Sequence, residues 1–455
     1  MMHPKTGLSL TLSLLLLSML ACTWIPGPAS PAPEDTIATS VAATLAADGP
    51  GPSPSPEGSA ETAPSPTDAP VDTPTPEPAH LQIAYVSDGD LWLWREGAAP
   101  VSLTSLGDVS SVRISDDGQR LAFTRRVDPL HQEIWAVNSD GSNTRTLVSS
   151  ADFESLAVDS EAVATNPANL GWVPGSHLLT FNTYPSYEGP GYFLANDLHQ
   201  VDADSGTLTT LLAPGSGGEF HYAPDGSQMA LVKPDLISLL NTDGTGRNDV
   251  LSFPMIYTYS EYALYPHPVW LPDSSAVRVI IPPQDPLGDP TAETTLWHIP
   301  ADGGAPTALL NFLAVPFFAS PAQLSPDGTQ LAYQVPIGAP ADNLSELHLR
   351  AADGSGDTIY ATGQLNFEAW SPDGSRFLYT SSGGGSPQIG QLGSPPQPLS
   401  GTSLVRDVRW IDNRQFLYLN RAGSSWEFWL GSIDAPSQLL ASSSGNDLIS
   451  YNFTR

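Results

Sequence analysis

"SPDGSRFLYTSS", residues 371–382, holds the pattern that decides the fold: a Pro-Asp-Gly turn followed at once by a short aromatic strand. Proline sets φ for the first corner of a tight turn, and glycine supplies the positive φ that other residues resist. The alternation after the turn predicts a strand with one buried face. The pattern returns as "SPDGTQLAYQVP" (325–336), "APDGSQMALVKP" (223–234) and "SDDGQRLAFTRR" (115–126). The chain therefore repeats one small structural unit.

Each unit predicts four antiparallel strands. The innermost strand ends, just before the turn, in an aromatic or large apolar residue: Ile114, Trp172, Tyr222, Trp270, Leu324, Trp370 or Trp410. A third strand such as "EIWAV" (133–137) leads into a second turn such as "NSDGSN" (138–143), and a short fourth strand closes the unit. A period of roughly 40–55 residues is typical of propellers and related arrays. We therefore expect an all-β propeller of four-stranded antiparallel blades.

The two turns in fixed order resemble the TolB-like β-propeller repeat, and the resemblance covers residues 81–455. It implies the propeller fold but no particular activity, because such propellers serve binding, scaffold and catalytic roles. TolB has a folded domain ahead of its propeller, whereas a proline-rich stretch stands there in this chain. A role in the TolB envelope complex is therefore not carried over.

Eight second strands can be counted, which predicts eight blades. They start near residues 83, 121, 178, 229, 277, 331, 377 and 416. The first unit has no innermost strand before Leu81, while "NDLISYNFTR" (446–455) contains an alternating strand that no other unit uses. We expect this C-terminal strand to complete the first blade, because a closed ring leaves no open edge. Seven blades is the alternative, if one irregular unit is only a loop.

Residues 1–21 predict a bacterial lipoprotein signal peptide. The apolar run "LSLTLSLLLLSMLA" (8–21) follows Lys5 and is shorter than the ~18–20 residues of a membrane-spanning helix. "MLAC" (19–22) resembles a lipobox, which implies that Cys22 carries a lipid after cleavage; Cys22 is the only cysteine in the chain. An ordinary secretory signal or an uncleaved anchor is the alternative. The expected location is the extracytoplasmic side of a cell membrane, with the lipid on Cys22 as anchor.

Residues 22–80 are rich in Pro, Ala, Ser and Thr and predict a disordered linker that tethers the propeller. A short helix over 34–48 is a less favoured alternative. The chain carries 17 basic and 48 acidic residues, a net charge of −31. Nucleic acid is thus excluded as a partner, since binding it needs clustered Lys and Arg. The acidic surface favours a soluble monomer.

The irregular connections follow the second and fourth strands, on the face opposite the Asp-Gly turns, and they concentrate tyrosines. Long loops on a rigid scaffold are commonly functional, and tyrosine suits recognition of sugars or protein surfaces. Tyr262, Tyr265 and His267 are the strongest candidates, because they precede the innermost strand "PVWL" (268–271) and should approach the channel mouth. The alternative is that these rings pack the loops onto the propeller rim.

Further ligand-binding candidates occupy similar places in other units. They are Glu219, His221, Glu368, Arg406, Asp407, Tyr187 and Tyr192. A site assembled across blades from Glu219, His221 and His267 would suit a lyase or a metal-dependent hydrolase. The chain has no Gly-x-Ser-x-Gly, no His-x-His and no His-Glu-x-x-His motif. We therefore predict no cofactor and no assigned catalytic or metal-binding residue.

The sequence favours a lipid-anchored, non-catalytic binding module for a protein or polysaccharide of the envelope or extracellular space. One alternative is an enzyme that processes glycans or peptides in a pocket at the channel mouth. The other is a structural spacer of the cell envelope.

Overall fold

The computed structural model describes residues 80–455 except 158, 189–193, 340–341, 382–386, 400–404 and 444–449. The described residues belong to the compact unit Thr75–Arg455. The predicted signal peptide, Cys22 and the linker lie outside them. Within the described ranges, no helix has the length and apolarity needed to cross a membrane.

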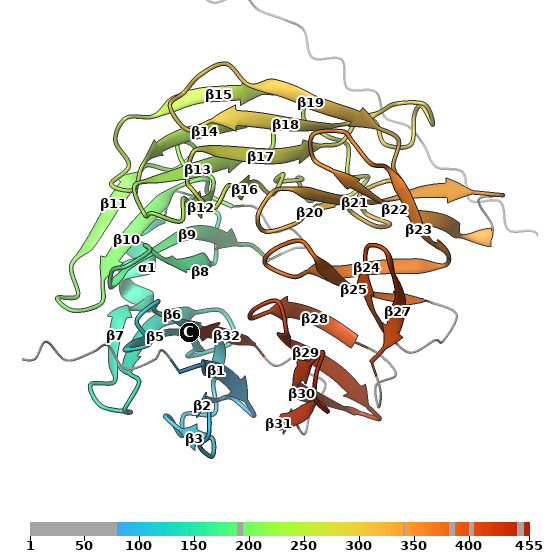
Figure 1. Cartoon of the computed structure of the whole chain (residues 1–455). Coiled ribbons are helices and arrows are strands. Elements are labelled where there is room, and N and C mark those ends of the chain that lie inside the picture. Colours follow the sequence, from blue (N-terminus) through green and yellow to red (C-terminus); the bar gives the residue numbers. More distant parts are fainter. Residues whose placement is uncertain are drawn as a thin grey trace, which may run out of the picture. The chain divides into compact units, whose positions relative to one another are not determined.

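Eight four-stranded antiparallel sheets form a ring, so eight blades, not seven, is the correct count (Figure 1). Blade 1 contains β1 (Gln82–Ser87), β2 (Asp90–Arg95), β3 (Val101–Ser102) and β32 (Tyr451–Thr454). Blade 2 contains β4 (Val109–Ile114), β5 (Arg120–Arg126), β6 (Gln132–Asn138) and β7 (Arg145–Val148). Blade 3 contains β8 (Ala164–Trp172), β9 (Leu178–Ser186), β10 (Leu198–Asp202) and β11 (Leu208–Leu212). Blade 4 contains β12 (Glu219–Tyr222), β13 (Gln228–Lys233), β14 (Leu236–Asn241) and β15 (Asn248–Ser252).

The remaining four blades follow in the same order. Blade 5 contains β16 (Val269–Trp270), β17 (Ala276–Ile281), β18 (Thr294–Pro300) and β19 (Thr307–Phe312). Blade 6 contains β20 (Gln323–Leu324), β21 (Gln330–Ile337), β22 (Leu344–Ala351) and β23 (Thr358–Gly363). Blade 7 contains β24 (Leu365–Trp370), β25 (Arg376–Ser381), β26 (Gln388–Gln391) and β27 (Ser394–Pro398). Blade 8 contains β28 (Val405–Trp410), β29 (Gln415–Ala422), β30 (Ser425–Ser432) and β31 (Gln438–Ser443).

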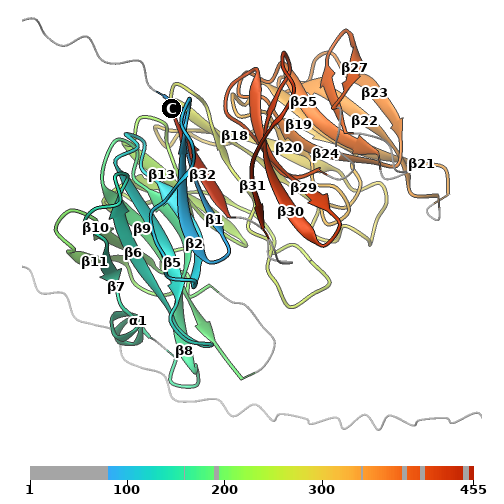
Figure 2. The same cartoon turned by 90° about the horizontal axis from the view of Figure 1, so that it is seen from below.

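The C-terminal strand closes the ring, as the sequence predicts. β32 pairs antiparallel with β1, with Tyr451 opposite Tyr85 and Thr454 opposite Gln82, and the two strands lie side by side in both views (Figures 1 and 2). Tyr451 is only 1% exposed and packs in a cluster that also contains Phe428 of blade 8. The last strand therefore fills the inner edge of blade 1 and joins it to blade 8.

The hydrophobic core is divided into eight clusters, one at each interface between neighbouring blades. The second strands contribute most: in β5, Leu121, Ala122 and Phe123 are fully buried. Both faces of such a strand are covered because each sheet packs between two others. Burying one Leu or Phe side chain contributes roughly 1.5–3 kcal/mol, so every interface is a substantial source of stability.

The repeated Asp-Gly turns have the geometry that their residues demand. Gly374 has φ +63°, and the carboxylate of Asp373 accepts the backbone N–H of Ser375 at 2.9 Å. Asp327 accepts from the Thr329 N–H in the same way at 3.0 Å. These aspartates stabilise turns.

The connection between β7 and β8 is not wholly irregular. It contains the short helix α1 (Ser150–Leu156), capped by a reciprocal pair of hydrogen bonds between Ser149 and Asp152. Phe153 is buried and packs edge-on against Phe181, with ring centroids 5.7 Å apart. A helix of two turns with a single buried residue has no visible period, so sequence patterns do not reveal it.

Candidate functional site

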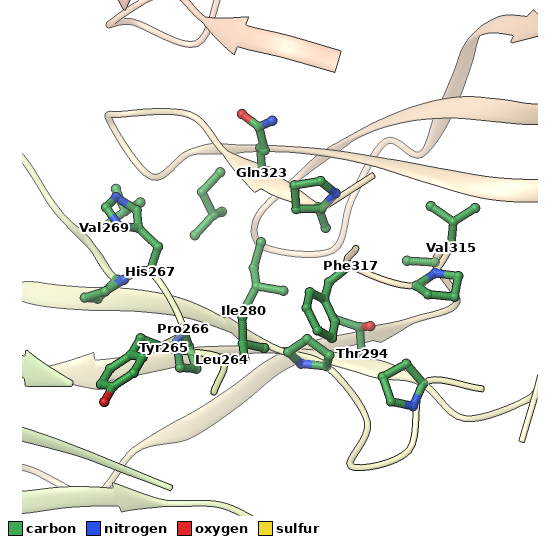
Figure 3. Close-up of a pocket in the computed structure, with 18 of the residues that line it drawn as sticks. Leu264, Tyr265, Pro266, His267, Val269, Ile280, Thr294, Val315, Phe317 and Gln323 are labelled. Atoms are coloured by element: carbon green, nitrogen blue, oxygen red, sulfur yellow. The ribbon is translucent and has the colours of Figure 1, made fainter. Parts of the chain in front are cut away.

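A cavity of about 1010 Å³ opens among the loops of blades 4 to 6 and continues along the inner strands to blades 7 and 8. We call it the proline-rich pocket. Its walls include the segments 264–270, 282–290, 314–317 and 321–326. Figure 3 shows Ile280, Phe317 and Gln323 around it, with His267 and Val269 at one side. The cavity has the size and concave shape of a ligand site.

Eleven prolines line this pocket: Pro266, Pro268, Pro282, Pro283, Pro286, Pro290, Pro316, Pro321, Pro326, Pro336 and Pro372. Proline fixes φ and has no backbone N–H, so these walls are stiff and present few hydrogen-bond donors. Asp289 and Arg409 are the carboxylate and the guanidinium among the lining residues. The surface offered to a ligand is therefore mainly apolar.

Three tryptophans at the ends of inner strands form part of the wall and join neighbouring blades. The indole N–H of Trp270 donates to the carbonyl oxygen of His221 in the preceding blade at 2.8 Å. Trp370 donates to the carbonyl of Gln323 at 3.2 Å, and Trp410 to that of Ala369 at 3.3 Å. The tryptophan before each of these three turns thus holds the pocket wall in place.

His221 and His267 meet in the proline-rich pocket, with ring centroids 4.5 Å apart and planes nearly perpendicular. Burial, with a smaller contribution from His267, lowers the pKa of His221 to about 3. The His267 side chain is exposed to the cavity, but the surrounding protein partly removes it from water, and this desolvation lowers its pKa as well. Both imidazoles are therefore neutral at neutral pH. Nε2 of His221 is buried and has no hydrogen-bond partner in the described part of the chain.

A second cavity of about 760 Å³ adjoins the first, and Tyr265 lines both. We call it the tyrosine pocket. Its lining comprises Leu194, Asn196, Glu219, Pro234, Met255, Ile256, Tyr257, Thr258, Tyr259, Ser260, Glu261, Tyr262, Ala263 and Tyr265. The Tyr265 hydroxyl donates to Oδ1 of Asn196 at 3.0 Å and points away from Phe317 (Figure 3). Burial raises the pKa of Glu219.

The sequence-predicted residues thus divide into three places. His221 and His267 line the proline-rich pocket, Glu219 and Tyr262 line the tyrosine pocket, and Tyr265 lies between them. Tyr262 is 49% exposed and lines the tyrosine pocket, not the proline-rich pocket that His267 lines.

The other candidates lie outside both linings. Glu368 accepts a hydrogen bond from Thr380 at 2.9 Å, and burial raises its pKa while nearby Arg406 lowers it. Asp407 is exposed and forms an ion pair with Arg409 at 3.2 Å. Tyr187 donates to Asp159 at 2.6 Å. Tyr192 lies outside the described residues.

The sequence patterns did not single out most of the lining, including Ile280, Thr294, Val315 and Gln323. The signal that could have revealed it is the run of prolines in "PPQDPLGDP" (282–290), which pointed to a rigid loop. In the described ranges, no group of three or more His, Cys, Asp and Glu side chains is placed to hold a metal ion.

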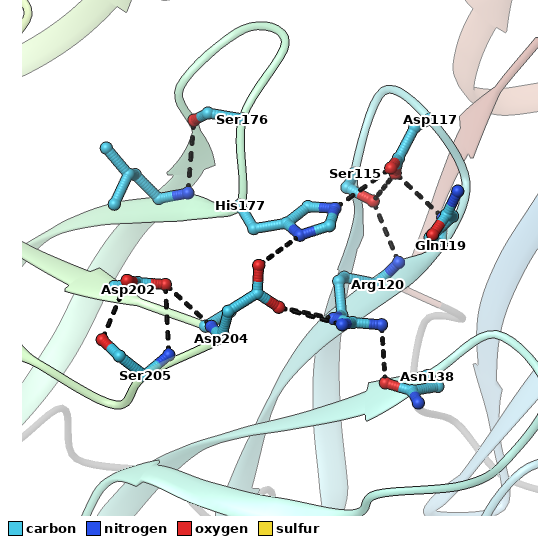
Figure 4. Close-up of polar contacts among 12 residues, drawn as sticks. Ser115, Asp117, Gln119, Arg120, Asn138, Ser176, His177, Asp202, Asp204 and Ser205 are labelled. Atoms are coloured by element: carbon cyan, nitrogen blue, oxygen red, sulfur yellow. Dashed lines mark hydrogen bonds and ion pairs between the residues drawn. The ribbon is translucent and has the colours of Figure 1, made fainter.

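A polar cluster on the Asp-Gly turn face links blades 2 and 3 (Figure 4). Nδ1 of His177 lies 2.8 Å from Asp204, and Nε2 lies 3.0 Å from Asp117. Arg120 also donates to Asp204, at 2.9 Å. Burial alone would lower the pKa of His177, but the hydrogen bonds with Asp204 and Asp117 outweigh it and raise the pKa.

Comparison with known proteins finds no matching protein-family model and no matching characterised protein sequence. Among solved structures, an oligogalacturonate lyase in complex with manganese aligns at 16% identity over 66% of this chain and 81% of that chain, with a TM-score of 0.42. TolB from Acinetobacter baumannii aligns at 15% identity over 60% of this chain and 61% of that chain, with a TM-score of 0.33. Dipeptidyl peptidase 4 from Porphyromonas gingivalis aligns at 14% identity over 73% and 53%, with a TM-score of 0.49. At these identities the similarity concerns the fold alone, and the eight-bladed ring rests on this chain's own strand pairing.

Proposed function

We propose that this protein is a lipid-anchored, extracytoplasmic binding module whose proline-rich pocket takes up an apolar segment of a protein partner. The observation that carries the proposal is the pocket itself: about 1010 Å³, walled by eleven prolines and three tryptophans. Stiff apolar walls favour binding, because they lose little conformational entropy when a ligand enters. A polysaccharide would need more hydrogen-bonding groups than this lining offers.

The histidine pair supports binding more than catalysis. A general acid or base works best with a pKa near the operating pH, and the pKa of His221 lies far below that range. Neither His221 nor His267 donates a hydrogen bond to a carboxylate in the described part of the chain that would orient its ring. As neutral groups they can each offer one donor and one acceptor to a ligand's peptide group.

Peptide display on the whole chain tests the binding role. We expect enrichment of peptides rich in apolar residues, and a loss of affinity of about tenfold in Phe317→Ala, as is common for a buried aromatic anchor. Phe318→Ala is the matched control, because Phe318 is 51% exposed, contacts Phe317 and does not line the proline-rich pocket. Peptides that bind equally to both variants and the native chain would contradict the proposal.

The anchor is tested separately. Labelling cells with a radioactive fatty acid should mark the native chain and not Cys22→Ser. The same substitution should move the protein from the membrane fraction to the soluble fraction. Equal labelling of both chains would refute lipidation at Cys22 and leave the binding proposal intact.

A further inference from the structure

We propose that the tyrosine pocket binds the ammonium or guanidinium group of a lysine or arginine side chain presented by a protein partner. The pocket brings one half-buried carboxylate, Glu219, together with four tyrosines, Tyr257, Tyr259, Tyr262 and Tyr265. Aromatic faces and a carboxylate both attract organic cations.

Among the described residues, none is a cationic partner of the Glu219 carboxylate. It lies in β12, and in the described ranges it makes no ion pair and no hydrogen bond through its side chain. Burial raises its pKa, with no opposing contribution from a neighbouring cation. Glu368 provides the contrast: burial raises its pKa too, but the hydrogen bond from Thr380 and the charge of Arg406 oppose that rise. Burial disfavours the charged form of a carboxylate that lacks such neighbours, and a ligand that supplies a positive charge would stabilise it.

The tyrosines expose their rings where a cation could approach. Tyr257, Tyr259 and Tyr262 are 52%, 57% and 49% exposed, which is unusual for three large side chains so close in sequence. Two rings are held in place by their hydroxyl groups, since Tyr259 donates to Asp285 and Tyr265 donates to Asn196. Fixed, exposed aromatic faces suit cation–π contact, which contributes about 0.5–2 kcal/mol per favourable pair.

The surrounding charge favours a cation over other ligands. Glu261 is a second carboxylate in the lining, and Asp285 is fixed beside Tyr259. Burial raises the pKa of Tyr265 most, and the negative charges of Glu219 and Asp235 raise it further, so both charges act on the pocket. With a net charge of −31 on the chain, an anionic group would be repelled here.

The inference deepens the proposed function, because Tyr265 lines both pockets and a single partner could place an apolar residue in one and a cationic residue in the other. Only one part of the inference rests on the proposed function, namely that the partner is a protein. Cation binding itself is measured with isolated side-chain analogues.

In the test, the whole chain is titrated with Nα-acetyl-lysine methylamide and with Nα-acetyl-arginine methylamide, and calorimetry measures the binding. Nα-acetyl-norleucine methylamide is the uncharged comparison. We expect both cations to bind at least about tenfold more tightly than norleucine, and Glu219→Gln to lose at least about tenfold. Affinity should also fall as the pH is lowered through the pKa of Glu219, because the protonated carboxyl no longer attracts the cation. Glu368→Gln is the matched control and should bind as the native chain does.

A second pair of variants keeps the test decisive if Glu219→Gln does not fold. Tyr262→Ala should weaken binding several-fold, while Tyr262→Phe, which retains the ring, should not. Equal binding of norleucine, unchanged binding by Glu219→Gln, or absence of binding by either cation would overturn the proposal. If the chain bound tetramethylammonium but neither the lysine nor the arginine analogue, the assignment to a protein side chain would be overturned. If Phe317→Ala lost its affinity for apolar peptides but still bound the cations, the two pockets would be shown to bind independently. The failure of one proposal could then be told apart from the failure of the other.

Discussion

At the scale of single residues, a few polar side chains join neighbouring blades that are otherwise held together by apolar packing. Trp270, Trp370 and Trp410 each donate to a carbonyl group of the preceding blade. A net contribution of about 1 kcal/mol is typical for such a bond, so the three fix the positions of the inner strands more than they add to total stability. His177 differs, because its contribution depends on pH.

The pH dependence of His177 has a definite sign. Its pKa in the folded protein is raised above the ordinary value of about 6.5 by Asp204 and Asp117. Its stabilisation is therefore fully present below about pH 6.5 and is lost as the pH rises through the raised pKa. We expect the native chain to lose free energy of unfolding between about pH 6 and pH 8.5 relative to His177→Asn. Because these side chains are partly solvated, the difference should be below about 1 kcal/mol.

Urea denaturation of both chains at the two pH values measures this difference. His80→Asn removes an exposed histidine at the beginning of the described chain and serves as the control. A native chain and a His177→Asn variant that respond identically to pH would show that protonation of His177 does not stabilise the link between blades 2 and 3.

At the scale of elements, β32 is the strand on which ring closure depends. Its four residues pair with β1 only, and Tyr451 is the buried one among them, packed in the cluster between blades 8 and 1. The guanidinium of Arg409 lies 4.5 Å from the centre of the Tyr451 ring, and the Tyr451 hydroxyl donates to the carbonyl of Asp407.

Replacing this one ring should therefore be costly. We expect Tyr451→Ala to lower the free energy of unfolding by about 3–5 kcal/mol, the usual loss for a large buried aromatic side chain. Phe453→Ala, on the same strand but only half-buried, should cost clearly less. Urea unfolding followed by tryptophan fluorescence gives both values. Similar losses for the two variants would mean that backbone pairing of β32, and not the Tyr451 ring, closes the propeller.

At the scale of the whole molecule, eight interfaces of one kind share the stability, and a large excess of negative charge opposes it. Like charges on a compact chain repel each other, and salt screens them over about 10 Å at 0.1 M. We expect the melting temperature to rise by about 2–4 °C between low salt and about 0.2 M sodium chloride, as for a gain of ~1 kcal/mol. The effect should vanish near the isoelectric pH of about 4.2, where the net charge is zero. A melting temperature that falls with salt at neutral pH would show that attractive ion pairs dominate.

The fold could be predicted from the sequence because its determinants are local. Each Asp-Gly turn specifies its own geometry, and the residue before it marks an inner strand, so eight repeats and the closing strand follow from short patterns. The site could be predicted only in part, because side-chain direction on the inner strands depends on β-bulges. In β28 the pairing register shifts between Arg406 and Arg409, and Asp407 has φ +48°. This bulge makes Arg409, not Asp407, line the proline-rich pocket, and no sequence period reveals it.

The pairing of β1 with β32 also sets an order of events during biosynthesis. Tyr451 follows Ser87 by 364 residues (451 − 87), so β1 leaves the ribosome long before its partner. At translation rates of about 5–20 residues per second, roughly 20–70 s pass before blade 1 can be completed. Throughout that time the inner edge of β1 is an unpaired strand, the kind of edge that promotes aggregation. Until β32 has been made, a nascent chain of this protein is therefore exposed to association with other chains through the inner edge of β1.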